Sequence, residues 1–426
     1  MSASPPCGID FGTSNSTVAL AEGTSSRLLA LEGDSVVLPS AIFFSFEEND
    51  IRFGREAVRH YVEGVEGRLM RSLKSVLGTQ AMGEKTAIKA QRWSFAEIIG
   101  LYLKELRRRG EEACGVPLEQ VVLGRPVFFI DRDEVADRRA QDELEAIARD
   151  AGFREIEFQF EPIAAALDYE RQVTGEELAV IIDLGGGTSD FSIVRVSPER
   201  RRRADRREDI LASSGVHVGG TDFDQLLSMR KVMPELGHGT PARDGKRDLP
   251  SWAYFELATW HRINFLYTPQ AAQMLKELRY DASEPERVQR LIDLVEERLG
   301  HALAGAVEGA KVGLSANDDY RMHFGLMNGS LDIAFSRGEL EGAIDGAVTR
   351  VGAALDECLK LAGVGEAEIS TVFLTGGSAS IPFVRQSLTG KFREAHVVQG
   401  DVFGSVGSGL ALDARRKFGR ALAAAE

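Results

Sequence analysis

Two stretches of this chain, far apart in sequence, combine an aspartate with glycines and hydroxyl side chains. In AVIIDLGGGTSDFSIVRV (179–196), an apolar β-branched run ends in Asp183, and three glycines and a threonine follow. Consecutive glycines let successive backbone N–H groups turn toward one point, which makes a partly positive nest for phosphate oxygens. A carboxylate at the strand end can hold a hydrated Mg²⁺ beside such phosphates. The alternative is a plain hairpin, but a hairpin seldom needs carboxylates at both mouths, as Asp183 and Asp190 provide.

The same layout occurs near the N-terminus, in CGIDFGTSNSTVAL (7–20). A strand ending in Asp10 is followed by Gly12, Thr13 and a returning strand. Two copies of a strand–Asp–Gly–Thr–strand unit indicate an internally duplicated architecture. If the two turns face each other, two acidic strand ends and two N–H nests converge on one polyphosphate.

Further glycine turns lie before predicted helices. Gly219 and Gly220 precede a helix whose N-terminus suits an anion. A third strand-to-glycine unit, STVFLTGGSASIPFV (370–384), leads into a helix near Ile381-Pro382. The segment GTQAMGEKT (78–86) resembles a P-loop, but Glu84 disrupts the expected ending and no strand precedes it, so we reject that match.

Two charged residues could complete the chemistry. Lys74 lies in RSLKSVLG, within a helix predicted over 56–77. Glu161 precedes a proline and three alanines, which predict a closely packed helix. The alternatives are a solvated lysine and an acidic residue near a positive helix end.

The remaining pattern supplies the elements that position these residues. An amphipathic helix is predicted over 94–110, a helix ended by Gly152 over 133–152, and a helical subdomain over 251–315. Asn328-Gly329 predicts a hairpin over 320–335, and a helix pair is expected over 336–363. The arginine-rich run at 200–207 lies at a hairpin tip, where such runs are usually solvated.

Composition bounds the function. The chain has 426 residues, too many for one small core, and a formal net charge of -14, which argues against a duplex nucleic-acid partner. Three scattered cysteines indicate neither a disulfide framework nor a metal site. The N-terminus has no signal-peptide pattern and no run reaches membrane-span length, so we expect a cytoplasmic protein without a membrane contact.

Taken in order, these motifs resemble those of the nucleotide-binding domain of the seventy-kilodalton heat-shock chaperones. The resemblance rests on the turns at Asp10 and Asp183 and on EPIAAAL, GGTDFD, VEGAKVGLS and LTGGSASIP. It implies an α/β, actin-like ATPase (ribonuclease H-like) fold of two lobes, each with a mixed sheet and flanking helices. Lobe I would span 1–170 with an inserted subdomain at about 34–115. Lobe II would span 171–396 with a helical insertion at about 224–315, and helices in 397–426 would return to lobe I.

The resemblance also implies roles for individual residues. The catalytic set would be Lys74, Glu161, Asp183, Thr188 and Asp190, and Asp10 and Asp183 would organise Mg²⁺ through waters. ATP or ADP would be held by Asp10, Gly12, Thr13, Ser14, Asn15, Gly185, Gly186, Gly187, Thr188, Gly219, Gly220, Glu308, Lys311, Ser315, Gly376, Gly377, Ser378 and Asp401.

The chain departs from the resembled family in two ways. Val312 and Ser380 stand where the family usually has arginines flanking the adenine, so affinity or base selectivity should be reduced. No peptide-binding β-sandwich follows Leu412, which gives the expectation of a free-standing nucleotide-binding module.

The leading hypothesis is a slowly hydrolysing, monomeric, chaperone-like ATPase whose lobe movement is read by a protein partner or co-chaperone. Three alternatives stay open at this point. They are a nucleotide-sensing scaffold that does not hydrolyse ATP, a small-molecule kinase, and a filament-forming protein on the same fold.

Overall fold

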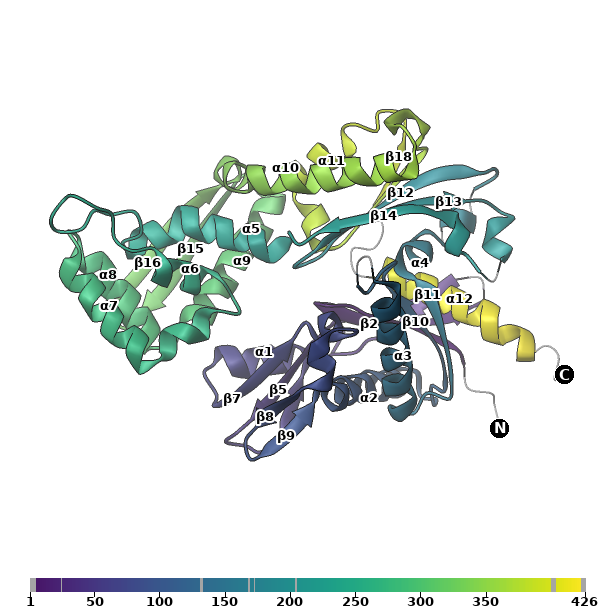
Figure 1. Ribbon diagram of the computed structural model, residues 1–426, viewed down its shortest axis with the longest axis horizontal. Helices are drawn as coiled ribbons and strands as arrows, with labels where there is room; N and C mark the ends of the chain where they lie inside the picture. The colour runs from purple at the N-terminus through teal and green to yellow at the C-terminus, as the bar shows by residue number, and fades with distance from the viewer. Residues whose placement is uncertain are drawn as a thin grey trace.

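The computed structural model describes residues 5–23, 25–130, 133–167, 169–171, 173–203, 205–399 and 404–422. Most of its strands belong to two large mixed sheets (Figure 1). The first sheet has the order β11-β10-β1-β2-β3, and the short β4 also pairs with β2. Its strands are Cys7–Phe11 (β1), Asn15–Glu22 (β2), Ser25–Leu28 (β3), Leu38–Pro39 (β4), Gln120–Arg125 (β10) and Glu155–Phe160 (β11). We call the elements around this sheet lobe I.

The second sheet has the order β14-β13-β12-β17-β18, and we call the elements around it lobe II. Its strands are Glu177–Leu184 (β12), Ser189–Val196 (β13), Ile210–Val216 (β14), Thr371–Thr375 (β17) and His396–Gln399 (β18). In both sheets the first three strands form an antiparallel meander, and the fourth and fifth strands run parallel to the first on its other side. This shared topology is the duplication that the paired turns predict.

Lobe I carries a smaller sheet and a hairpin between β3 and β10. The small sheet comprises Ala41–Ser45 (β5), Ile51–Phe53 (β6) and Gly67–Arg71 (β7), with helix Gly54–Val62 (α1), and the hairpin comprises Lys85–Ile88 (β8) and Gln91–Ser94 (β9). Helices Phe95–Cys114 (α2) and Glu134–Asp150 (α3) flank the large sheet. Both helices confirm the sequence prediction, and Ser94 and Asp133 cap their first turns.

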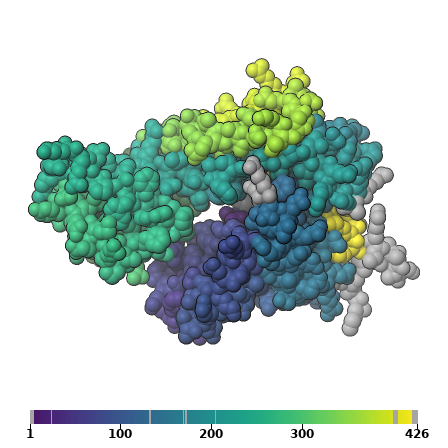
Figure 2. Space-filling model, in the orientation of Figure 1, coloured from purple at the N-terminus to yellow at the C-terminus, as the bar shows by residue number. Residues whose placement is uncertain are grey.

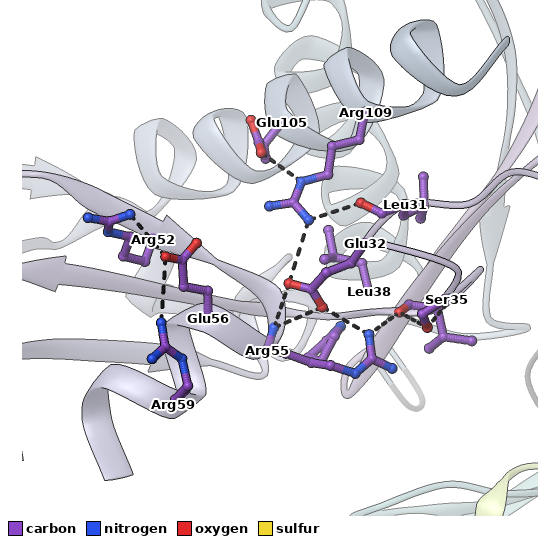
Figure 3. Close-up of polar contacts among 12 residues, drawn as sticks. Leu31, Glu32, Ser35, Leu38, Arg52, Arg55, Glu56, Arg59, Glu105 and Arg109 are labelled. Atoms are coloured by element: carbon purple, nitrogen blue, oxygen red, sulfur yellow. Dashed lines mark hydrogen bonds and ion pairs between the residues drawn. The ribbon is translucent and has the colours of Figure 1, made fainter. Parts of the chain in front are cut away.

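Ion pairs join this smaller subdomain to helix α2 (Figure 3). The Glu32 carboxylate pairs with Arg55 of α1 at 2.9 Å and with Arg109 of α2 at 3.6 Å. Arg109 also pairs with Glu105 at 2.7 Å and donates to the Leu31 carbonyl at 3.0 Å. One carboxylate therefore links the loop before β4 to two helices.

The predicted helix over 56–77 is wrong beyond α1. Gly64 adopts a left-handed φ of 78° and the chain turns back as β7, which pairs with β5. A 3₁₀ helix, Leu73–Val76, then carries Lys74. Residues 67–71 of this segment form a strand of the small sheet. The spacing of their apolar side chains is therefore that of a strand and not that of the expected helix.

Lobe II carries a mainly helical region after β14. Its helices are Gly220–Leu227 (α5), Trp252–Ala258 (α6), Pro269–Asp281 (α7), Pro285–Glu296 (α8) and Gly300–Ala316 (α9), followed by the hairpin Asp319–Leu326 (β15) and Gly329–Ser336 (β16). The hairpin is the one that Asn328-Gly329 predicts. The expected helix pair over 336–363 is instead one helix, Arg337–Ala362 (α10), which begins at a capping box on Ser336 and ends at Gly363. Helix Pro382–Thr389 (α11) completes the lobe.

The arginine-rich segment is only partly solvated, since Arg203 and Arg207 are exposed whereas Arg206 is buried. Arg206 is only 2% exposed and donates two hydrogen bonds to Glu170, at 2.8 and 2.9 Å, and a further one to Asp209. Arg207 lies over the ring of Phe160 in lobe I, at 5.9 Å from its centroid. The segment therefore packs onto lobe I, which a count of charges does not predict.

Helix Ser405–Leu422 (α12) and helix Glu161–Leu167 (α4) lie between the two large sheets. Leu410 of α12 belongs to one apolar cluster with Val122 of lobe I and Ile181 of lobe II. Glycines allow this approach, because a Cβ added at Gly409 would lie 1.8 Å from the carbonyl oxygen of Ala164. The small residues of this segment thus serve close packing. Among the described residues, no helix has the length and apolarity that crossing a membrane would require.

Candidate nucleotide site

The turn of the β1–β2 hairpin meets the turn of the β12–β13 hairpin. A Cβ added at Gly186 would lie 2.8 Å from the Ser14 hydroxyl, which belongs to the opposite lobe. Gly12, Thr13, Ser14 and Asn15 all keep part of their surface exposed, as do Gly185, Gly186, Gly187 and Thr188. The two turns therefore face each other with accessible backbone.

Four charged residues gather beside these turns. The ammonium of Lys74 donates a hydrogen bond to the Glu161 carboxylate, which joins the 3₁₀ helix after β7 to the start of α4. Lys74 is 8% exposed, and burial alone would lower its pKa, but the charges of Glu161 and Asp10 raise it. The lysine is therefore held in its charged form.

The two aspartates of the site are poorly compensated. Burial, and then the charge of Glu161, raises the pKa of Asp10 to about 7, although Lys74 opposes this shift. Burial, followed by the charges of Asp190, Glu161 and Asp10, raises the pKa of Asp183 to about 7 as well. Excess negative charge of this kind fits a divalent cation, which would favour both ionised carboxylates. Among the described residues, no group of three or more His, Cys, Asp or Glu side chains is placed to hold a metal ion.

The glycine turns of lobe II interlock through their backbones. The Gly185 carbonyl accepts hydrogen bonds from the Gly220 N–H at 3.1 Å and from the Ser378 hydroxyl at 3.3 Å. The Gly186 carbonyl accepts from the Thr221 N–H and from its hydroxyl, both at 2.8 Å. The structure thus brings the glycine turns at 185–187, 219–220 and 376–378 onto one surface.

Gly376 is required where it stands. Its φ is 82°, and an added Cβ would lie 2.3 Å from the Leu184 carbonyl oxygen and 2.8 Å from Asp183 Oδ1. Gly377 follows at the surface, and Ser378 is buried. This turn therefore abuts the strand end that carries Asp183.

Helix α9 presents the residues assigned to the nucleoside. Glu308, Lys311 and Ser315 follow one another at helical spacing along one side. Lys311 is buried, and its ammonium donates to the Gly220 carbonyl at 3.0 Å and to Asp224 Oδ2 at 2.8 Å. Val312 is 61% exposed and Ser380 is also exposed. Asp401 lies outside the described residues.

Asp224 is a site residue that sequence reasoning missed. Its carboxylate anchors Lys311, and its Oδ1 is buried without a hydrogen-bond partner. Burial raises its pKa to about 6, although Lys311 acts in the opposite direction. The motif GGTDFD contained the signal, because an aspartate one turn after a glycine nest points back toward that nest.

The two lobes also touch at a second place, which we call the cleft mouth (Tyr61, Arg71, Trp260, Asn264 and His301). The rings of Tyr61 and His301 lie 4.4 Å apart, and Asn264 donates to the Tyr61 hydroxyl. The Arg71 guanidinium lies 5.3 Å from the Trp260 ring centroid. Figure 2 shows a hollow between the green helices of lobe II and the purple part of lobe I.

Two mixed sheets with one topology, facing glycine turns and paired acidic strand ends define an actin-like ATPase fold. A family model described as "Hsp70 protein" matches residues 6–236 and 280–414. The chain belongs to the Hsp70 family and corresponds to its nucleotide-binding region. It is 27% identical over 387 residues to "Chaperone protein DnaK" of Elusimicrobium minutum (strain Pei191). That alignment covers 89% of this chain and 52% of the relative, so the chain spans about half the relative's length.

Proposed function

We propose that this protein binds ATP and ADP with Mg²⁺ between the facing glycine turns, hydrolyses ATP slowly, and changes its lobe separation with nucleotide state. The observation that carries the proposal is the Lys74–Glu161 pair, which faces Asp10 and Asp183 where turns from both lobes meet. Membership of the Hsp70 family supports it.

Transfer of a γ-phosphoryl group to water needs positioning and charge compensation more than a covalent nucleophile. The N–H groups of 12–15 and 185–188 would hold the phosphates from the two lobes, with 219–220 beside them. Lys74 would compensate the charge that develops on the transferred group. Mg²⁺, held by Asp10 and Asp183 through water, would supply further positive charge.

The attacking water would be oriented by Glu161. Its carboxylate already accepts a hydrogen bond from Lys74, so it is fixed in direction without substrate. The Thr188 hydroxyl donates to Asp190 at 2.9 Å, which holds this second pair on the lobe II side. Glu308, Lys311, Ser315 and the turn 376–378 would contact the nucleoside.

Closure would be the output of the cycle. Glu161 lies at the start of α4, and α4 packs with α12 between the sheets. A change in the bound phosphates that moves Glu161 would therefore alter the packing at the lobe interface. A protein partner that reads this separation would make the chain a nucleotide-dependent switch, acting as a monomer in the cytoplasm.

A second candidate is a nucleotide-sensing scaffold without hydrolysis, which the uncharged Val312 and Ser380 favour. Titration calorimetry with ATP and with ADP, together with a phosphate-release assay, tests both candidates. We expect binding of both nucleotides and phosphate release above the buffer rate. Binding without release would leave the scaffold, and no binding at millimolar nucleotide would contradict both candidates.

A further inference from the structure

Arg71 is placed to act on the same ligand as Lys74. It is the last residue of β7, and only Ser72 and Leu73 separate it from Lys74. Ser72 has a left-handed backbone, with φ 55° and ψ 34°, which is uncommon for a residue other than glycine. This turn sends the two cations from one strand end toward two parts of the cleft.

The guanidinium of Arg71 crosses to lobe II. It lies over the Trp260 ring, and its charge adds to the effect of burial in lowering the pKa of His301 to about 4. Its own pKa is lowered by burial, while the charge of Glu308 opposes that shift. His301 and Glu308 are two turns apart on α9, about 10 Å along the helix, so Arg71 lies alongside this part of α9.

No carboxylate among the described residues forms an ion pair with Arg71, and it retains exposed surface. The neighbouring cation on lobe II, Lys311, is already committed to Asp224 and the Gly220 carbonyl. The other two positions assigned to the base, Val312 and Ser380, carry no charge. Arg71 is thus a cation beside the nucleoside region, with its guanidinium carbon 5.3 Å from the Trp260 ring centroid.

Trp260 lies in a part of the chain outside the family match, which is interrupted between residues 236 and 280. A guanidinium is planar and stacks on aromatic faces, so the face away from Trp260 can accept a second ring.

We propose that Arg71 contacts the nucleoside of bound ATP or ADP from lobe I, its guanidinium stacking between the Trp260 ring and the purine base. This inference rests on the proposed nucleotide binding. It makes Arg71 a specificity residue for the base, distinct from Lys74, which acts on the phosphates.

The test compares two ligands, Mg²⁺-ATP and Mg²⁺-tripolyphosphate, by titration calorimetry. The replacement Arg71→Ala should weaken ATP binding about tenfold, the size of a partly desolvated cation–π contact, and leave tripolyphosphate binding within twofold of wild type. Arg71→Lys keeps the positive charge but lacks the planar guanidinium, so its ATP affinity should lie between that of wild type and that of Arg71→Ala.

Two further variants separate stacking from a structural effect. Val312→Arg in the Arg71→Ala background should restore part of the ATP affinity, since it returns a guanidinium to the same region. Arg68→Ala is the matched control, because Arg68 is also on β7 but donates to the Ala87 carbonyl within lobe I. It should change neither affinity.

Equal loss of both ligands, or an unchanged ATP affinity in Arg71→Ala, would overturn the assignment. Wild-type protein that binds ATP no more tightly than tripolyphosphate would overturn it too. Wild-type protein that binds no ATP would contradict the proposed function itself, and that result is read before any variant is compared.

Discussion

The Lys74 ammonium and the Glu161 carboxylate are hydrogen-bonded across 87 positions of sequence. We expect Lys74→Ala and Glu161→Gln each to reduce ATP turnover by about 10²- to 10³-fold, because each removes a group that acts in the transition state. Nucleotide affinity should change far less. Steady-state phosphate release and calorimetry measure the two effects, and Lys85→Ala, an exposed lysine on β8, is the control. Undiminished turnover in both variants would contradict the assignment.

The pKa values of Asp10 and Asp183 predict how stability depends on pH. Both rise from 3.8 to about 7 on folding, so between about pH 4 and pH 7 the native state binds more protons than the unfolded chain. The free energy of unfolding should therefore fall as pH rises through this window in ligand-free protein. Asp183→Asn should flatten that fall, and urea unfolding at pH 5 and pH 8 measures it. If the difference in free energy of unfolding between wild type and Asp183→Asn is the same at both pH values, the interpretation is refuted.

The same pKa values predict the pH dependence of Mg²⁺-ATP binding. A divalent cation requires the ionised carboxylates, so affinity should increase from pH 6 to pH 8, with protons released on binding. Calorimetry in two buffers of different ionisation enthalpy measures the proton release. Asp183→Asn should release fewer protons than wild type, and equal release would exclude Asp183 as the source.

The cleft-mouth contact between Tyr61 and lobe II should slow nucleotide release. We expect Tyr61→Ala to increase the ADP dissociation rate about fivefold, because it removes a ring contact worth about 0.5–1.5 kcal/mol and a hydrogen bond to Asn264. Tyr61→Phe keeps the ring and should show a smaller increase. Stopped-flow displacement of a fluorescent ADP measures both rates. Equal rates in wild type and Tyr61→Ala would show that lobe opening does not limit release.

The buried pair of Arg206 with Glu170 should be important for stability. Each side chain is 1% exposed, so Arg206→Ala would leave Glu170 as an uncompensated buried charge, while Asp209 would keep only its ion pair with Arg200. We expect a loss of about 3–5 kcal/mol in the free energy of unfolding. Arg203→Ala, at an exposed position in the same segment, should cost less than about 0.5 kcal/mol. Similar losses in the two variants would contradict the role of burial.

The fold was largely predictable because its signals are local. The turns after Asp10 and Asp183 are encoded by adjacent glycines, and the order of strand, glycine and helix repeats along the chain. Lys74 was assigned to the wrong element, since Gly64 and the pairing of β7 with β5 override the helical spacing. Sheet pairing is a non-local effect that one window of sequence does not contain.

The charge network around Arg206 was not predictable from the sequence. Its partner Glu170 lies 36 positions away, and arginine runs with the same composition are commonly solvated. The role of Asp224 was missed for a related reason, because its partner Lys311 lies 87 positions away. Pairing between distant charges is decided by the packed structure.

The position of α12 constrains when the two lobes can fold during synthesis. Residues 405–422 lie against β1, β2 and β10, so the sheet that contains residues 7–11 keeps an uncovered apolar face until this last helix has left the ribosome. The strands of lobe II are complete once residue 399 has emerged, but Ile181 and Val194 of its sheet share an apolar cluster with the same helix. We therefore expect both lobes to reach their native packing only after residues 405–422 have emerged.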